Sequence, residues 1–261
     1  MFEHFEVTIT PLNRKRTIRV FLPEEYHEEG EKCYPVLYMH DGQNLYNDED
    51  AGYGMAWGIS DFLIKTELPL IVVGIDCNVE GHKRLDEYGP WPNEFMKKEF
   101  NTSDEVGGEG KEYIDFVVKE LKPLIDSKYR TDREDTSMAG SSMGGLISTY
   151  AACVYPHVFK KVAALSSSYW FNEKEIESLI MESDLSQMEK FYLDLGTNEE
   201  KGPKENEISI ELSKKIFHIL NGKVKSCKFQ IVEGALHNEL AWKERVPGIF
   251  SYLFGCVKGQ C

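Results

Sequence analysis

The sequence has few features that would tie the protein to a membrane or to a nucleic acid. No apolar run approaches the roughly 20 residues that cross a bilayer. The N-terminal stretch Met1-Phe2-Glu3-His4 lacks the basic and apolar regions of a signal peptide. Basic side chains are scarce, at 30 against 44 acidic ones, and the formal charge of -14 repels phosphate backbones and anionic lipids. We therefore expect a cytoplasmic protein with neither a nucleic-acid nor a membrane partner.

Cysteine pairs at metal-ligand or redox spacing are also absent. No C-x-x-C pair occurs among the six cysteines, which are Cys33, Cys77, Cys153, Cys227, Cys256 and Cys261. We interpret them as reduced thiols, and we expect neither a metal nor a cofactor. The 261 residues with 41% hydrophobic content suffice for a large core, so we predict one domain over residues 1–261. The oligomeric state stays open, with a homo-oligomer among the alternatives.

The first part of the chain changes from alternating to continuous apolar patterns. Apolar residues alternate with polar ones around residues 5–9 and 18–22, and turn residues at 11–15 separate the two stretches, which predicts an antiparallel hairpin. Residues 35–39 and 70–75 are continuous apolar runs, as expected of strands buried on both faces. A helix over 57–64 can connect these two strands.

Strands and helices continue to alternate in the rest of the chain. We predict helices over 110–128, with a kink or restart at Pro123, from Ser142, from Asn172 and over 208–220. Strands are predicted over residues 135–139, 161–165, 190–195 and 228–232. Residues 77–108 and 199–206 are predicted as long loops. This order indicates an α/β fold with a doubly wound, mainly parallel sheet and an antiparallel N-terminal hairpin.

The segment Gly140-Ser141-Ser142-Met143-Gly144 has the G-x-S-x-G pattern of a nucleophile elbow. In such an elbow the serine lies on a tight turn between a strand and a helix. The residues two before and two after it must be small, so that the two backbones can pass close together. Glycine meets this demand around Ser142, whereas Met143 would crowd the turn if Ser141 were the nucleophile. Ser142 is therefore the candidate nucleophile.

A serine nucleophile needs a base and an acid that orients the base. His237 is the candidate base because it lies in the loop after the last predicted strand, where α/β-hydrolases carry their histidine. Asp194, Glu199 and Glu200 compete for the acid position near the end of strand 190–195. Glu199 is preferred because it follows a Gly-Thr-Asn turn, whereas Asp194 lies within the strand and Glu200 fits a solvated charge.

The oxyanion hole of such a site needs two backbone N–H groups. Met143, directly after the nucleophile, supplies one, and Gln43 is the candidate for the other because a glycine precedes it after the strand at 35–39. Asp41 and Gly42 are placed with it as substrate-binding residues. A metal site at His40 and Asp41 is disfavoured, since no partner pair at ligand spacing accompanies them.

Two tryptophans are candidates for the substrate entrance. Trp57 and Trp91 lie in or beside long irregular stretches, where aromatic side chains either bind a ligand or pack the loop on the sheet. Both roles are open for Trp91. How residues 77–108 and 169–188 close over Ser142 would set the preference for acyl and alcohol groups.

Several of these segments together resemble the putative esterase family, which includes esterase D, feruloyl, acetyl-xylan and siderophore esterases. The resemblance runs from about Val20 to Phe254 and rests on residues 35–44, 84–91, 140–145, 196–199 and 237–242. It implies an α/β-hydrolase fold and cofactor-free hydrolysis of a small carboxylic ester. In that family the positions of Ser142, His237 and Glu199 hold the nucleophile, base and acid, although siderophore esterases can work with a Ser-His dyad.

We therefore expect a serine carboxylesterase that forms an acyl-enzyme on Ser142. Two alternatives remain at this point. An acyltransferase would use the same residues with an acceptor other than water, and a binding protein would keep the scaffold without the reaction.

Overall fold

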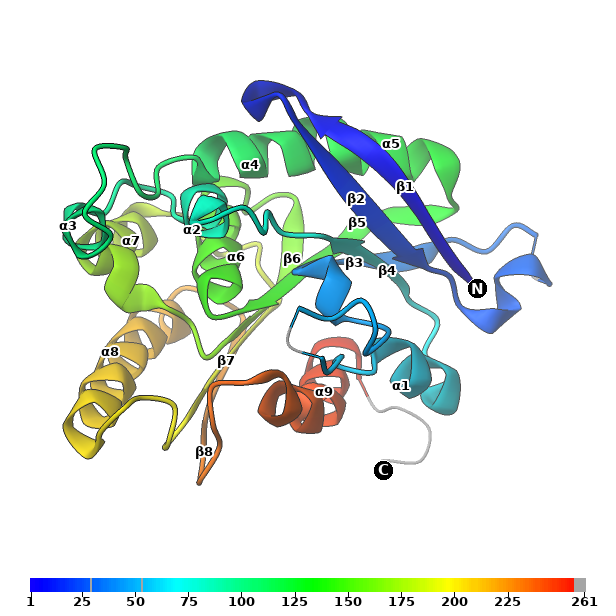
Figure 1. The fold of residues 1–261 in the computed structure, drawn as a ribbon. Coiled ribbons are helices and arrows are strands. Elements are labelled where there is room, and N and C mark those ends of the chain that lie inside the picture. The colour runs from blue at the N-terminus through cyan, green and yellow to red at the C-terminus, as the bar shows by residue number, and fades with distance from the viewer. Residues whose placement is uncertain (29, 53, 256–261) are drawn as a thin grey trace.

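The protein is described by a computed structural model that covers residues 1–28, 30–52 and 54–255. Within these residues eight strands form one sheet in the order β1-β2-β4-β3-β5-β6-β7-β8 (Figure 1). The pairs β1-β2 and β2-β4 are antiparallel, and every pair from β4 to β8 is parallel. The strands are β1 (Phe2–Ile9), β2 (Arg14–Phe21), β3 (Tyr34–His40), β4 (Ile71–Ile75), β5 (Thr131–Ser141), β6 (Phe159–Leu165), β7 (Lys190–Gly196) and β8 (Ser226–Val232).

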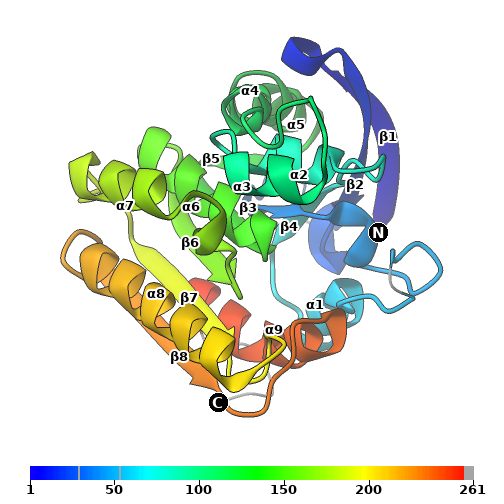
Figure 2. The ribbon, with the colours of Figure 1, turned by 60° about the vertical axis from the view of Figure 1, so that its left-hand side comes forward.

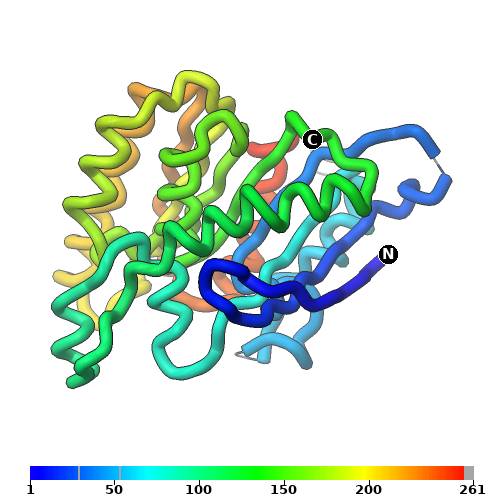
Figure 3. The backbone as a smooth tube through the Cα atoms, turned by 90° about the horizontal axis from the view of Figure 1, so that it is seen from above, coloured from blue at the N-terminus to red at the C-terminus, as the bar shows by residue number. Residues whose placement is uncertain are grey.

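Helices cover both faces of this sheet. Figure 2 shows α1 and α9 on one side and α4 to α8 on the other, and Figure 3 shows the N-terminal hairpin far from α8. The helices are α1 (Ile59–Thr66), α2 (Lys83–Tyr88), α3 (Glu94–Glu99), α4 (Gly110–Phe116), α5 (Lys122–Lys128), α6 (Met143–Val154), α7 (Glu173–Glu182), α8 (Pro203–Asn221) and α9 (Glu239–Phe254). The expected doubly wound α/β arrangement with an antiparallel hairpin is confirmed.

The central strands bury both of their faces. Along β3, Val36 and Tyr38 belong to the core under α4 to α8, whereas Leu37 and Met39 belong to the core under α1 and α9. Successive side chains of a strand point to opposite faces, so a strand between two helical layers needs an unbroken apolar run. This requirement explains why residues 35–39 and 70–75 could be predicted from the sequence.

The long helix predicted over residues 110–128 keeps a continuous course but changes its type. It consists of α4, a π-helical turn at Val117–Leu121 and then α5, in which Pro123 lies in the first turn. Proline has no N–H to donate to a carbonyl one turn earlier, and a local change of helix type accommodates the missing bond. The backbone stays helical through Leu121 and Lys122, so a π turn in front of Pro123 takes the place of the predicted kink or restart.

Two predicted loops are partly helical. Residues 77–108 contain α2 and α3, and the loop predicted over 199–206 ends where α8 begins at Pro203. The helices α2 and α3 have six residues each, which is too short for an apolar period to be visible. Proline in the first turn of a helix is a start signal, and it accounts for the earlier beginning of α8.

The expectations drawn from composition concern thiols and membrane spans. Cys33, Cys77, Cys153 and Cys227 are free thiols, while Cys256 and Cys261 lie outside the described residues. Among the helices of the described ranges, none combines the length and the apolar character needed to cross a membrane.

Candidate active site

Ser142 lies on the strained turn that its sequence pattern predicts. β5 ends at Ser141 and α6 begins at Met143, and Ser142 between them has φ 58° and ψ -122°. Such backbone angles are rare for a residue with a side chain and are found at functional turns. A Cβ on Gly140 would lie 2.7 Å from the backbone of Gly144, so only glycine lets strand and helix pass this closely. Strand, turn and helix therefore present the hydroxyl of Ser142.

The Ser142 hydroxyl is hydrogen-bonded to another serine. Its Oγ lies 3.1 Å from Oγ of Ser168, and the backbone N–H of Ser168 donates to the carbonyl oxygen of Ser142 over 3.1 Å. Ser168 follows β6 closely and was not singled out in the sequence, because a serine after a strand carries no motif. A residue just after the neighbouring strand β6 therefore holds the candidate nucleophile Ser142.

Glu199 and His237 are brought together although 38 residues separate them. Oε2 of Glu199 lies 3.0 Å from Nδ1 of His237, and the carboxylate side chain is only 2% exposed. Its Oε1 accepts hydrogen bonds from Ser166 Oγ at 2.7 Å and from the N–H of Gly196 at 2.6 Å. Burial alone would raise the pKa of Glu199, but the hydrogen bonds from His237, Ser166 and Gly196 outweigh burial and hold that pKa below its usual value. Glu199 is therefore an ionised hydrogen-bond acceptor for the histidine.

Asp194, the competing acid, has different partners. Its Oδ1 accepts a hydrogen bond from Arg245 at 2.9 Å, and its Oδ2 accepts one from the hydroxyl of Tyr192 at 3.2 Å. Arg245 also donates to Oε1 of Glu199 over 3.2 Å, so one guanidinium lies between the two carboxylates. Burial raises the pKa of Asp194 to about 6 against the opposing effect of Arg245, and the charge of Glu199 adds to the rise. This geometry supports Glu199, and Asp194 helps to hold Arg245 in place.

His237 is positioned by the start of α9 and by aromatic packing. Asn238 caps α9, because its side chain accepts a hydrogen bond from the N–H of Ala241 at 3.0 Å. The ring of Trp242 lies 5.0 Å from the ring of His237, and Trp57 lies 5.7 Å from Trp242. The His237 side chain is 35% exposed and reaches a cavity. Trp57 is thus buried behind the histidine loop, and its expected place at the substrate entrance is not found.

The loop after β3 brings Gln43 to the same place. Asp41 has φ 56°, and a Cβ on Gly42 would lie within 2.8 Å of the backbone of Gly74 and Ile75. The Gln43 side chain is fixed at the end of β4, since its Oε1 accepts from the N–H of Cys77 at 3.0 Å. Glycine is required here because the loop lies directly on β4. Gly42 is buried and does not line the cavity, so its expected contact with the substrate is not found. Its role is a spacing role, in which the missing side chain lets the loop lie close to β4.

The two candidate oxyanion donors are backbone N–H groups at the ends of turns. The short 3-10 turn η3 (Gly42–Asn44) is closed by the N–H groups of Asn44 and Leu45, not by that of Gln43. Met143 is the first residue of α6, so its N–H has no carbonyl one turn earlier in the helix. The side chain of Met143 is buried, which leaves only its backbone to serve the site.

Asp41 forms an ion pair with Arg84, a residue for which the sequence predicted no role in the site. Arg84 donates from Nε to Oδ1 of Asp41 over 2.7 Å and from a terminal nitrogen to Oδ2 over 2.9 Å. The hydroxyl of Tyr88 accepts the N–H of Asp41 at 3.1 Å. Burial would raise the pKa of Asp41, but Arg84 holds it below its usual value. Asp41 lines the cavity as one half of an ion pair, and the signal that could have found Arg84 is its place in the segment 84–91.

Several of these groups line one cavity of about 810 Å³. Its wall includes Asp41, Gln43, Arg84, Ser142, His237 and Glu239. The wall residues come from loops and helix starts that follow the carboxyl ends of the parallel strands, where open α/β sheets bind their ligands. No group of three or more potential metal-ligating side chains is found in the described ranges.

Trp91 does not line the cavity at Ser142, so its expected place at the substrate entrance is not found either. It borders a separate hollow with residues of α7 and packs edge-on against Tyr150, with ring centroids 5.5 Å apart. Its role in the structure is the packing of its loop on α6. The alternative left open by the sequence is thereby decided in favour of packing.

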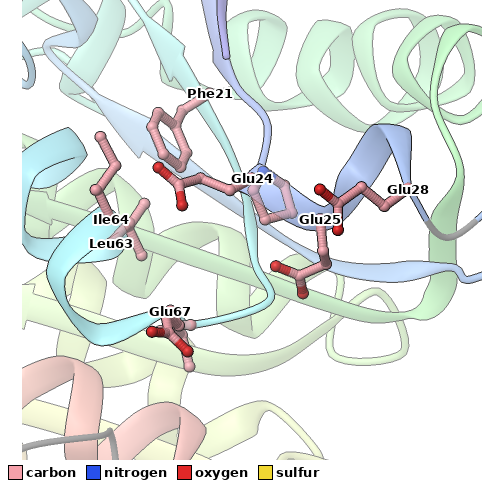
Figure 4. Close-up of a pocket in the computed structure, with 9 residues that line it drawn as sticks. Phe21, Glu24, Glu25, Glu28, Leu63, Ile64 and Glu67 are labelled. Carbon is pink, nitrogen blue, oxygen red and sulfur yellow. The ribbon is translucent and has the colours of Figure 1, made fainter.

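A smaller hollow of about 200 Å³ lies between η2 (Glu24–His27) and α1. Figure 4 shows that glutamates and apolar side chains form its wall, namely Glu24, Glu25, Glu28, Glu67, Phe21, Leu63 and Ile64. It includes none of the residues that the sequence points to. The larger cavity around Ser142 is therefore the candidate active site.

A family model described as "Putative esterase" matches residues 9–253 of the chain. The chain belongs to this family. Ester-bond hydrolysis is accordingly the class of reaction assigned to it. The esterase is similar to the uncharacterized protein YbbA of Bacillus subtilis strain 168, with 28% identity over 253 residues that cover 93% of each chain.

Solved structures confirm the α/β-hydrolase fold of the esterase. An IroE-like serine hydrolase from Shewanella oneidensis matches with a TM-score of 0.77 and 19% identity over 95% of this chain and 79% of the other. The BES protein from Bacillus cereus matches with a TM-score of 0.73 and 19% identity over 96% and 94% of the two chains. The siderophore hydrolase EstA from Aspergillus nidulans matches with a TM-score of 0.70 and 16% identity over 94% and 92%.

Proposed function

We propose that the esterase is a serine carboxylesterase that hydrolyses small carboxylic esters through an acyl-enzyme on Ser142. The observation that carries this proposal is the contact of Glu199 with Nδ1 of His237 at 3.0 Å, in a loop that borders the same cavity as Ser142. A carboxylate at Nδ1 fixes the proton on that nitrogen and leaves Nε2 free to act as a base.

In the acylation step Ser142 Oγ attacks the ester carbonyl carbon, and His237 Nε2 takes the hydroxyl proton. The negative charge moves to the carbonyl oxygen, where the N–H groups of Gln43 and Met143 donate hydrogen bonds to it. The carbon–oxygen bond to the alcohol then breaks, and His237 returns the proton to the leaving oxygen. Glu199 stays ionised and stabilises the imidazolium that forms in between.

In the deacylation step water takes the place of the alcohol. His237 removes a proton from water while the oxygen attacks the acyl carbon, and the same two N–H groups hold the second oxyanion. Collapse releases the carboxylic acid and restores the hydroxyl of Ser142. The cavity around His237 is open to solvent, since the histidine side chain is 35% exposed, and this favours water as the acceptor.

The names of structurally similar proteins agree with ester chemistry. One is described as a ferulic acid esterase, and others as siderophore hydrolases or enterobactin esterase. We take these names, together with the formal charge of -14, to support a small-molecule ester rather than a nucleic acid as the substrate.

Hydrolysis of p-nitrophenyl acetate by wild type and Ser142→Ala tests the proposal. The variant is expected to keep its fold, as judged by circular dichroism, and to lose several orders of magnitude in kcat. Turnover near that of wild type in the folded variant would overturn the mechanism. Adding an alcohol and analysing the products separates water from other acyl acceptors.

A further inference from the structure

The wall of the candidate active site contains a carboxylate that the proposed reaction does not use. Glu239 is only 6% exposed, borders the cavity and is the first residue of α9. Among the described residues no salt bridge to Glu239 is found, and its one hydrogen bond is to its own backbone N–H. The N-terminus of α9 favours a negative charge at this position but supplies no counter-ion.

The charged and titratable groups that act on Glu239 are Asp41, His237 and Arg84. Arg84 already makes two hydrogen bonds to Asp41, so this pair is neutral as a whole. Burial raises the pKa of Glu239, and the charge of Asp41 raises it further. A buried carboxylate without a counter-ion is costly, and a positively charged ligand group would remove that cost.

The position of Glu239 also indicates which part of a substrate it faces. It is two residues beyond His237, the group that protonates the leaving alcohol in the proposed reaction. Met55, Val79 and Leu240 of the same cavity wall are apolar and suit a methylene or methyl-bearing group. A cation with apolar substituents on the alcohol side of the ester matches this combination.

On the basis of the proposed ester hydrolysis, we propose that Glu239 is a specificity-determining residue that binds a cationic group on the alcohol part of the substrate. The preferred substrate class is then an ester of an amino or quaternary ammonium alcohol. Glu239 supplies the negative charge that binds the cation. Arg84 does not neutralise this charge, because it is already paired with Asp41.

The test compares two esters with the same acyl group. Acetylcholine carries the cation, and 3,3-dimethylbutyl acetate is its neutral counterpart of the same shape. Wild type is expected to show the higher kcat/KM for the choline ester, and Glu239→Gln is expected to lower the ratio of the two values by about tenfold. Glu244→Gln, an exposed acid of the same helix, is the matched control and should keep the wild-type ratio.

Two results would overturn the proposal: equal kcat/KM values for both esters in wild type, or an unchanged ratio in Glu239→Gln. Inhibition of p-nitrophenyl acetate hydrolysis by choline and by 3,3-dimethylbutanol gives a second readout that needs no turnover of either ester. Equal inhibition by the two alcohols would also overturn it. Because that background reaction depends on Ser142, its presence or absence separates a failure of this inference from a failure of the proposed function.

A second, independent observation concerns the run Ser166-Ser167-Ser168 after β6. Ser168 is 6% exposed, and its Oγ lies 3.1 Å from Oγ of Ser142. At the other end of the run Ser166 donates to Glu199 and accepts hydrogen bonds from Trp242 at 2.9 Å and from Arg245. One strand end therefore contacts both the nucleophile and the acid.

We infer that Ser168 is a positioning residue that holds the Ser142 hydroxyl for attack. Ser168→Ala is expected to lower kcat for p-nitrophenyl acetate by about tenfold with KM unchanged, as the loss of one hydrogen bond predicts. Ser168→Thr keeps the hydroxyl and should restore part of kcat. Ser167→Ala is the matched control, because Ser167 lies against Gly145 of α6, and among the described residues the hydrogen bonds to Ser142 and Glu199 come from Ser168 and Ser166 instead. A wild-type kcat in Ser168→Ala, or an equal loss in Ser167→Ala, would contradict the inference.

Discussion

Replacement of Glu199 by glutamine changes one oxygen that accepts a hydrogen bond into an NH₂ group that donates. In the native site Oε2 accepts from Nδ1 of His237 at 3.0 Å, so the proton stays on Nδ1 and Nε2 can act as the base. The amide removes the negative charge and favours the wrong tautomer, and such a loss can cost about four orders of magnitude in kcat. This factor corresponds to about 5.4 kcal/mol of transition-state stabilisation.

The same substitution also affects stability. Oε1 of Glu199 accepts from Arg245 at 3.2 Å, and that guanidinium keeps a second partner in Asp194 at 2.9 Å. We therefore expect Glu199→Gln to melt at a lower temperature but to remain folded. Asp194→Asn, by contrast, is expected to lose stability while keeping most of its turnover, because the hydrogen bonds of Asp194 go to Arg245, Tyr192 and Ser166 rather than to His237.

The assay is steady-state hydrolysis of p-nitrophenyl acetate, with circular dichroism to confirm folding at the assay temperature. Glu199→Gln is predicted to lower kcat with little change in KM. Loss of turnover in folded Asp194→Asn together with an active Glu199→Gln would show that the acid assignment is reversed. Activity retained in both variants would show that Ser142 and His237 work as a dyad.

Packing and buried charge at Gly42, Trp91 and His40 lead to measurable effects on stability. Gly42→Ala should lower both the melting temperature and kcat, because the new Cβ would lie 2.7 Å from the backbone of Gly74, and an unchanged kcat would refute the spacing role. Trp91→Ala should lower the melting temperature and leave kcat/KM for bulky esters unchanged, since its ring packs on Tyr150. Burial lowers the pKa of His40 from 6.5 to about 4. The unfolded chain therefore binds a proton at this residue more readily than the folded protein, so the contribution of neutral His40 to the free energy of unfolding is present above pH 6.5 and lost as the pH falls toward 4. The free energy of unfolding, measured with urea, should therefore fall by about 3 kcal/mol less in His40→Gln than in wild type between pH 7 and 4. An equal fall in both proteins would contradict the lowered pKa of His40.

The sequence predicted the fold, and it pointed to Ser142 and to the contacting pair Glu199 and His237, because these features leave signals in the chain. Buried parallel strands appear as continuous apolar runs, and the elbow around Ser142 needs glycine at fixed distances. His237 and Glu199 follow from the order in which strand ends come along the chain. The apolar runs and the elbow thus depend on residues near one another in sequence, whereas His237 and Glu199 depend on the order of the strands along the chain.

The parts that the sequence did not predict depend on contacts between distant segments. Arg84 meets Asp41 across 43 residues, and Ser168 meets Ser142 across 26. Neither pairing has a spacing rule, because the separation depends on the length of the intervening loops. Trp57 was placed at the entrance for its residue type, whereas its burial against Trp242 is decided by the packing of α9.

The most direct test of the central assignment is mass spectrometry of the protein after reaction with a fluorophosphonate, which modifies activated serines. We expect one adduct, located on Ser142, and none in Ser142→Ala. An adduct on Ser141, or undiminished labelling of the Ser142→Ala variant, would contradict the assignment of the nucleophile.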